Sequence, residues 1–348
     1  MAAEKQTTKK LHHFVPQAYL RGFANEKERL TAVRLPGDHS FTTIVRNVAA
    51  QMHFHRVEGL DKPDEFEDVL ASIEGEAQAI IRKLERRGGP RLTDVERHTF
   101  AFYIALQAVR GPETRRTSET MRANIVRIEV GAGGRRNVGA WAKENLGFEP
   151  NEEQEERIWQ EATQEGGPPI ALPNVAHIKH MMHMAEHLTK YVLARPWVMV
   201  HFTKRSLITS DAPVSLVRKP DDDAWMGVGF ATAAFITFPL TRRLGLLMGD
   251  PMKFVAELGA DDPKLQVIGN SVRSGKFDLV QEETAALAKF FNEHTTDSAS
   301  QYLFHHPDDQ RYVPEELPEP HLVTMSMNGG LTDVEWDGTP MFGPASEE

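Results

Sequence analysis

Trp197-Val198-Met199-Val200-His201-Phe202 decides the fold class of this chain, because it opens a series of short runs rich in β-branched and aromatic residues. Four further runs follow, divided by proline, glycine or aspartate: Leu207–Ile208, Val214–Val217, Ala234–Phe238 and Leu244–Met248. Runs of this length and composition predict β-strands. We expect them to form one mixed or antiparallel sheet in the second half of the chain.

Helical patterns dominate the chain before this series. Apolar residues recur at helical spacing from Asp64 to about Arg87, where Gly88-Gly89-Pro90 ends the pattern. Thr93 and Glu96 form a capping-box pattern that opens a second helix to about Val109. The remaining helices are expected at Pro112–Val130, within residues 140–166, at Val175–Leu193 with Asn174 as its cap, at Pro263–Asn270 and at Glu282–Asn292.

Two strands are expected before the helices. Leu30–Leu35 and Phe41–Val45 alternate between apolar and polar residues around Pro36-Gly37-Asp38, which predicts a hairpin. Residues 11–23 are expected to form a short helix or an ordered loop. The order of hairpin, helices and late sheet is typical of an α+β protein with a helix-rich first half.

The domain organisation follows from length and composition. The chain has 348 residues, of which 40% are apolar, so it can bury a large core. We expect residues 1–10 to be a flexible N-terminus and residues 11–294 to form a single α+β domain, with a helical part at 64–195 and a sheet part at 196–294. Residues 295–348 are acidic and rich in proline, and we expect them to form a tail with little core of its own.

Several features are absent from the sequence. There is no cysteine, which excludes disulfides, thiolate metal sites and cysteine nucleophiles. No segment approaches the roughly 18 consecutive apolar residues of a membrane helix, and no apolar signal core is present, so we expect a cytoplasmic protein without a membrane partner. GxSxG, HExxH and Walker patterns are also absent, which disfavours several common enzyme classes.

The net charge of −10 is unevenly distributed. Residues 77–140 contain thirteen basic residues, twelve of them arginine, against six acidic residues. Residues 295–348 contain eleven acidic residues and one arginine. The Arg-rich strip 77–140 is either a binding surface for an anionic partner or an ordinary solvated helix face with ion-pair partners.

Four stretches occur in a fixed order along the chain. They are His12–Phe23 (HHFVPQAYLRGF), Asn47-Val48-Ala49-Ala50 with Phe54, Glu67 and Glu74 behind it, Gln107–Pro112 (QAVRGP), and Ile208–Val214 (ITSDAPV) with Phe238-Pro239-Leu240 and Asn270 behind it. In this order they resemble the bacterial family known as domain of unknown function 4238. The resemblance covers roughly residues 11–280, and Ala18, Gly22 and Ala212 depart from the family pattern at positions that affect packing and turns. It implies where site residues lie and does not imply a reaction.

The paired histidines are the most unusual feature. In a helix His12 and His13 would diverge by about 100°, so both cannot face one ligand. Either one of them is a metal ligand or general base, or both brace the segment against the body. Glu67 and Glu74 lie two helical turns apart beside an apolar stripe. They either complete a site with a histidine or pair with a basic residue at the edge of the stripe.

Arg110 and Asp211 each have either a structural or a functional interpretation. Arg110 either complements the end of an apolar helix or binds a phosphate or a carboxylate such as Asp211. Asp211 either satisfies its own backbone in a turn or presents a carboxylate at the end of a strand.

Two clusters of histidines occur later in the chain. His177, His180, His183 and His187 share a helix face, and His183 and His187 have a spacing that can chelate a metal. We expect a partly exposed face there instead. His305-His306 is expected to lie in a loop of the tail.

These residues together predict a hydrolase acting on a phosphate-containing substrate, in the class of a metal-dependent nuclease. The expected catalytic residues are His12, His13, Glu74, Arg110 and Asp211. The expected substrate-binding residues are Gln17, Arg115, Arg116, Ser210 and Asn270. A divalent metal ion (Mg, Mn or Zn) would be held by His13, Glu74 and Asp211. The alternative is a non-enzymatic regulatory protein that binds nucleic acid or an acidic partner through the Arg-rich strip 77–140, with the acidic tail competing for that strip.

Overall fold

The computed structural model describes residues 11–86, 91–221, 227–255, 258–259 and 262–320. Two compact units are present among these residues, where the sequence predicted a single domain. The larger unit contains residues 11–111 and 174–320, and the smaller unit contains residues 112–173. None of the helices in the described ranges is long and apolar enough to cross a membrane.

The larger unit is α+β, as predicted. Its α-helices are α1 (Gln17–Leu20), α2 (Glu65–Glu85), α3 (Asp94–Val109), α7 (Asn174–Leu193), α8 (Lys264–Arg273) and α9 (Ala285–Ser298). Short 3-10 helices lie at Arg21–Phe23, Val45–Asn47, Pro251–Phe254 and Pro307–Tyr312. The expected capping box is confirmed, because the Thr93 hydroxyl accepts from the Glu96 amide and the Glu96 carboxylate accepts from the Thr93 amide. Asn174 begins α7 rather than preceding it.

Eleven strands of the described residues form three sheets. The strands are β1 (Leu11–His13), β2 (Arg29–Arg34), β3 (His39–Ile44), β4 (Ala50–Met52), β5 (Trp197–His201), β6 (Thr209–Ser210), β7 (Ser215–Val217), β8 (Phe235–Thr241), β9 (Leu244–Gly249), β10 (Leu279–Glu282) and β11 (Tyr302–His305). Their orders are β1-β4, β10-β5-β9-β8-β7 and β3-β2-β11-β6. The predicted hairpin is β2 and β3.

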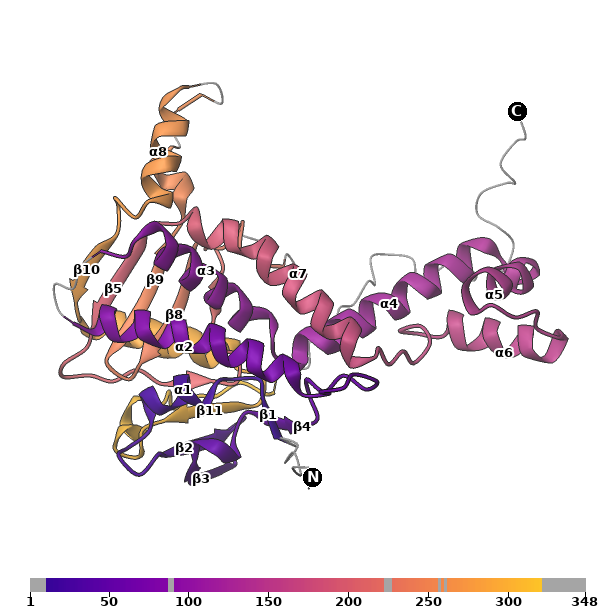
Figure 1. Ribbon diagram of the computed structural model, residues 1–348, viewed down its shortest axis with the longest axis horizontal. Helices are drawn as coiled ribbons and strands as arrows, with labels where there is room; N and C mark the ends of the chain where they lie inside the picture. Colours follow the sequence, from indigo (N-terminus) through magenta and orange to yellow (C-terminus); the bar gives the residue numbers. More distant parts are fainter. Residues whose placement is uncertain (1–10, 87–90, 222–226, 256–257, 260–261, 321–348) are drawn as a thin grey trace, which may run out of the picture. The chain divides into compact units, whose positions relative to one another are not determined.

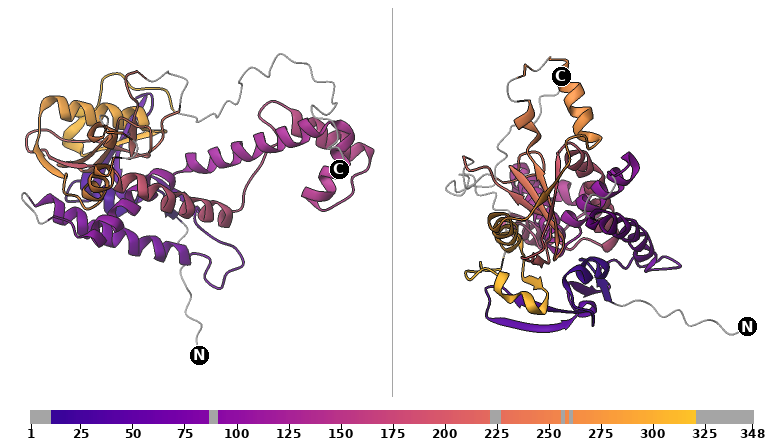
Figure 2. Two further views of the ribbon diagram at one scale, coloured as in Figure 1. Left: turned by 90° about the horizontal axis from the view of Figure 1, so that it is seen from above. Right: turned by 90° about the vertical axis from the view of Figure 1, so that its left-hand side faces the viewer.

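The five-stranded sheet carries the core. Figure 1 shows α2 and α3 crossing one face of this sheet, and the right-hand view of Figure 2 shows α9 on the opposite face. Phe100 and Tyr103 of α3 pack on Trp197 of β5 and Phe238 of β8, with ring centroids 6.0 and 6.3 Å apart. All four side chains are fully buried. The late apolar runs therefore supply the surface on which the earlier helices pack.

Three predictions about local structure are wrong. Residues 11–13 form a strand, and helix begins only at Gln17. The strand expected at Leu207–Ile208 forms instead at Thr209–Ser210 as β6, and it belongs to the four-stranded sheet, not to the sheet of β5, β7, β8 and β9. Residues 295–320 are not a tail, because β11 lies between β2 and β6 and buries Leu303 and Phe304. The flexible N-terminus predicted at residues 1–10 and the part of the predicted tail at residues 321–348 lie outside the described residues.

The smaller unit is helical. It contains α4 (Pro112–Gly133), a 3-10 helix at Arg135–Asn137, α5 (Val138–Leu146) and α6 (Glu152–Thr163). Val126, Val130, Val138 and Ala162 form its buried core. The expected helical segment 140–166 is therefore divided into α5 and α6 by a turn in which Gly147 adopts a left-handed conformation.

Candidate functional site

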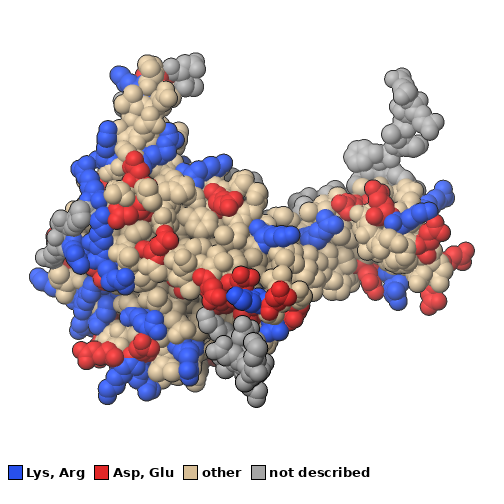
Figure 3. All heavy atoms as spheres, viewed as in Figure 1, with Lys and Arg blue, Asp and Glu red and all other residues tan. Residues whose placement is uncertain are grey.

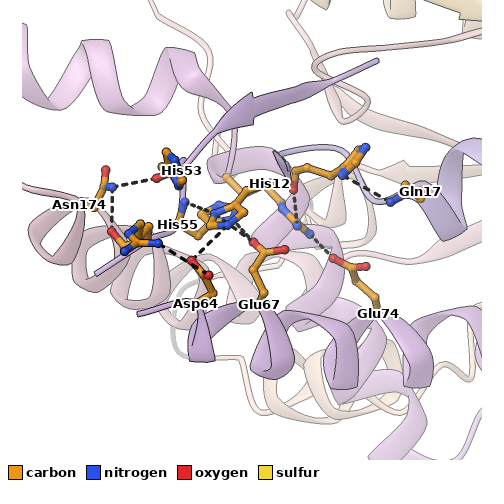
Figure 4. A network of polar contacts seen from close by, with 11 residues as sticks. His12, Gln17, His53, His55, Asp64, Glu67, Glu74 and Asn174 are labelled. Carbon is orange, nitrogen blue, oxygen red and sulfur yellow. Dashed lines mark hydrogen bonds and ion pairs between the residues drawn. The ribbon is translucent and has the colours of Figure 1, made fainter. Parts of the chain in front are cut away.

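Two strands and one helix of the larger unit place the candidate site. β1 and β4 are antiparallel, with His12 opposite Gln51 and His13 opposite Ala50. The chain leaves β4 through His53, Phe54 and His55, and it then enters α2. Figure 4 shows the side chains of His12, His55 and Glu67 converging between these elements. Both histidines are fully buried, and 15% of the Glu67 side chain is exposed.

Glu67 is the common partner of the two histidines. Its Oε1 lies 2.6 Å from His55 Nδ1 and 3.8 Å from His12 Nδ1. Burial alone would raise the pKa of Glu67, but the hydrogen bond and charge of His55, with His12 and Arg110, lower it below its ordinary value. The carboxylate is therefore ionised at neutral pH, and it accepts a short, charge-assisted hydrogen bond from His55 Nδ1–H.

The hydrogen bonds of His12 define its tautomer. The backbone N–H of His55 donates to His12 Nδ1 over 2.8 Å, so that nitrogen presents a lone pair. The proton of the neutral ring is then on Nε2, which lies 3.4 Å from Asp64 Oδ1. A carboxylate beside the distal nitrogen of a histidine is the usual outer partner of a metal-binding imidazole.

These three side chains come close to the spacing of a metal site. Each of His12, His55 and Glu67 offers one ligand atom, and these atoms all lie within 4.8 Å of one another. Two ligand atoms that bind one ion at about 2.1 Å lie at most about 4.2 Å apart, so a small contraction would enclose an ion. A metal ion at His12 Nδ1 would compete with the N–H of His55 for the same lone pair.

The loop that carries His55 is held from outside the site. Ala49 and His53, at the two ends of β4, have φ angles of 51° and 56°, which are uncommon for residues other than glycine. Nδ2 of Asn174 donates to the backbone oxygens of His53 and Arg56 over 3.0 and 2.8 Å. Such backbone conformations persist where the surroundings enforce them, often at functional sites.

His13 and Arg110 form a second group next to this cluster. His13 Nε2 donates to the backbone oxygen of Arg46, and Gln17 Nε2 approaches His13 Nδ1 at 3.5 Å. Burial lowers the pKa of His13, so its ring is neutral at pH 7. The buried guanidinium of Arg110 donates to Glu74 Oε1 and to the backbone oxygen of His13, both over 2.8 Å. Arg110 therefore joins β1 to α2 and α3.

The structure thus places five predicted site residues in these two neighbouring groups: His12, His13, Gln17, Glu74 and Arg110. Asp211, also a predicted site residue, has a structural role in another part of the unit. Its carboxylate accepts the backbone amides of Ser300, Gln301 and Tyr302 over 2.8, 2.8 and 3.1 Å, which fixes the chain just before β11. We therefore correct its role from metal ligand to structural anchor. Ser210 beside it accepts from the backbone amide of Ala212.

The other predicted substrate-binding residues belong to α8 and to the smaller unit. Asn270 is an exposed residue of α8 and accepts from Arg273. Arg115 and Arg116 belong to α4 of the smaller unit. Burial lowers the pKa of Arg115 to about 10, and Arg116 pairs with Glu113.

The Arg-rich strip 77–140 is not one exposed surface, because it falls on both units. Arg97 and Arg110 are buried and paired with Asp278 and Glu74. Arg135 pairs with Glu156 in the smaller unit.

The remaining histidines also have local roles. His180, His183 and His187 are exposed on α7, as expected, and His177 is buried. His305 was expected in a loop but ends β11, where it is buried and Nδ1 donates to the backbone oxygen of His306.

The predicted site residues did not include Glu67, which was considered beside Glu74 but not chosen, nor His55, Asp64 and Asn174. The predicted metal ligands His13 and Glu74 belong instead to the neighbouring group around Arg110. His55 follows Phe54 directly within one of the four family-like stretches. Its adjacency to that motif was the available signal. No local spacing connects it to His12, because only the pairing of β1 with β4 brings the two together.

Comparison with known proteins places the chain in a family without a described activity. No curated protein and no solved structure matches it. Residues 11–309 match the family described as a protein of unknown function, DUF4238, which extends the resemblance beyond residue 280 and into β11. The chain therefore belongs to the DUF4238 family.

Proposed function

We propose that this protein is a metal-dependent hydrolase acting on a phosphate-containing substrate, in the class of a nuclease. The observation that carries the proposal is the cluster of His12, His55 and Glu67, whose ligand atoms lie within 4.8 Å of one another. Two imidazoles and one carboxylate are a donor set used by hydrolytic zinc sites and also suited to manganese. A bound ion of this kind lowers the pKa of a coordinated water toward about 7.

The roles of the neighbouring residues follow from their contacts. Asp64 Oδ1 lies 3.4 Å from His12 Nε2, and its charge favours the ring form in which Nε2 carries the proton and Nδ1 the lone pair. Metal binding at His55 Nδ1 requires the loss of the proton that this nitrogen now shares with Glu67. Affinity should therefore fall as the pH decreases through the range in which imidazoles bind protons.

The phosphate part of the proposal rests on Arg56. Its guanidinium lies 4.0 Å from Asp64 and 2.7 Å from Glu58, and 22% of its side chain is exposed. An arginine at the border of a metal site supplies the planar donor pair that matches a phosphate group. The buried Arg110 is less suited to contact a substrate, because Glu74 and the His13 carbonyl occupy its donors.

The test uses the full chain purified without a histidine tag. Metal content is measured by mass spectrometry, zinc and manganese binding by calorimetry, and phosphodiester cleavage with bis(p-nitrophenyl) phosphate and with DNA and RNA. His12→Ala, His55→Ala and Glu67→Gln should each lose the metal and the activity. His98→Ala is the matched control, because His98 is an exposed histidine of α3.

Two outcomes would contradict the proposal. One is the absence of metal binding together with equal behaviour of the three variants and the control. The other is bound iron with oxygen consumption and no phosphodiester cleavage, since two histidines and a carboxylate also hold iron in oxygenases.

A further inference from the structure

The edge of the five-stranded sheet presents an uncovered strand. β10 is the outermost strand on its side and pairs in parallel with β5, from Leu279 opposite Val198 to Glu282 opposite His201. All four residues of β10 are exposed, and the exposed fractions of Leu279 and Val280 are 62% and 61%. Because successive side chains point to opposite faces, both faces of this edge are open among the described residues.

The directions of the backbone groups follow from one hydrogen bond. The Glu283 amide donates to the His201 carbonyl over 3.1 Å, so the backbone N–H of Glu283 points toward β5. The direction of the backbone N–H and C=O groups alternates along a strand. The backbone groups of Leu279 and Gln281 therefore also point toward β5, whereas those of Val280 and Glu282 point away from it. Within the described part of the chain no strand pairs with these outward groups.

Native proteins usually blunt such an edge with charge, proline or a bulge. Here the first two residues of the strand, Leu279 and Val280, are apolar. The sheet edge therefore has the properties of a surface that accepts a further strand.

The charges at the two ends of β10 favour an acidic partner. The carboxylate of Asp278, before the strand, pairs with Arg97 and accepts the Trp197 amide. That of Glu283, after the strand, accepts three backbone amides of residues 203–205. Both acids are thus occupied internally.

Basic side chains stand beside these occupied acids. Lys276 is exposed before β10, and Lys204 is exposed in the turn that binds Glu283. Arg91 is also exposed, and its charge acts on Asp278. Figure 3 shows lysine and arginine gathered along the side where Figure 1 places β10. Glu282 is the exposed acid within this edge.

We propose that the β10 edge binds an extended segment of a partner protein, in which apolar residues alternate with acidic ones. The segment would add a strand next to β10, with backbone hydrogen bonds to Val280 and Glu282. Its apolar side chains would cover Leu279 or Val280, and its acidic side chains would lie near Lys276 and Lys204. This inference does not depend on the metal site.

The test measures binding of a fluorescein-labelled synthetic peptide, Val-Glu-Val-Glu-Val-Glu-Val, by fluorescence polarisation. The same peptide with lysine in place of glutamate is the charge control. We expect binding of the glutamate peptide only, with slower hydrogen exchange at the amides of Val280 and Glu282.

Val280→Pro removes an outward N–H and leaves the hydrogen bonds to β5 in place, because proline is tolerated at sheet edges. It should weaken peptide binding by about tenfold or more, the effect of about one hydrogen bond with added steric conflict. Val280→Thr, which keeps the N–H, is the matched control and should bind as the wild type does. Lys276→Glu with Lys204→Glu should weaken binding of the glutamate peptide.

Three results would overturn the proposal: no binding of the glutamate peptide at millimolar concentration, equal binding of both peptides, or undiminished binding by Val280→Pro. A dimer in solution that Val280→Pro converts to a monomer would also overturn it, because the occupant would then be a second copy of this chain.

Discussion

Arg110 should be one of the most sensitive positions in the larger unit. Arg110→Met keeps the length of the side chain but removes the guanidinium that joins Glu74 to the His13 carbonyl. Only 2% of the Arg110 side chain is exposed, against 19% for Glu74. The substitution therefore leaves a largely buried carboxylate and a buried carbonyl without their donor.

The magnitude follows from these contacts. A hydrogen bond to a charged group contributes about 1.5–3 kcal/mol, and removal of one partner of a buried ion pair costs about 3–5 kcal/mol. Because water still reaches part of Glu74, we expect the lower end, about 3 kcal/mol. Glu74→Gln should cost less, about 1–2 kcal/mol, since the amide oxygen still accepts from Arg110.

Urea unfolding followed by circular dichroism measures these differences, with Arg82→Met on the exposed face of α2 as the control. In the double variant of Arg110 and Glu74, the two costs should fall short of additivity by about 1 kcal/mol or more. An Arg110→Met cost within about 0.5 kcal/mol of the control, the range of ordinary surface substitutions, would refute the assigned role. Additive costs in the double variant would refute the direct coupling.

Asn174→Asp should lower zinc affinity by about tenfold to a hundredfold, measured by calorimetry, because a carboxylate cannot donate to the two carbonyls that hold the His55 loop; unchanged affinity and unchanged amide exchange in that loop would contradict this. Burial raises the pKa of Asp211 to about 6, although the amides that it accepts lower it. A carboxyl group with a higher pKa in the folded than in the unfolded state stabilises the fold when it is protonated. This contribution to the free energy of unfolding, at most about 3 kcal/mol, is fully present below about pH 4 and is lost as the pH rises through about 6. Asp211→Asn should remove that component, so the wild-type advantage in urea unfolding should be larger at pH 4.5 than at pH 7.5, and an equal advantage at both would contradict it. Gly167→Ala should destabilise the smaller unit far more than Gly166→Ala in thermal unfolding. Both glycines have φ near 79°. An added Cβ at Gly167 would lie 2.3 Å from a backbone oxygen of α4, whereas one at Gly166 would meet nothing within 4 Å. Equal midpoints for the two glycine variants would rule out that close approach.

Local sequence patterns predicted the elements better than their partners. The capping box at Thr93 defined the start of α3, and apolar periodicity defined α2, because these signals act within a few residues. β6 takes its place in the four-stranded sheet by pairing with β11, which residues 302–305 form far along the sequence. No local pattern encodes that pairing, so β6 was assigned to the wrong sheet and β11 to a tail.

The same limit applies to the candidate site. His12 was identified because it belongs to an unusual motif. Of the two carboxylates beside the apolar stripe, the prediction chose Glu74, whereas the structure places Glu67 with His12. His55 was not identified, because it enters the site only through the β1–β4 pairing. Asp211 was overvalued for the opposite reason: its position after a strand suggests a ligand, but the backbone amides before β11 satisfy it.

The insertion of β11 between β2 and β6 has a consequence for synthesis of the protein. The pairing joins Thr31 to His305, so β2 leaves the ribosome long before its partner exists. Until then one side of β2 is unpaired and β6 lacks its partner strand, and such edges invite aggregation. The described core of the helical unit of residues 112–173 joins elements that are close in sequence, so it can form while the rest of the chain is still being translated. The larger unit completes its four-stranded sheet only after residue 305 has emerged, so the two units should mature at different times.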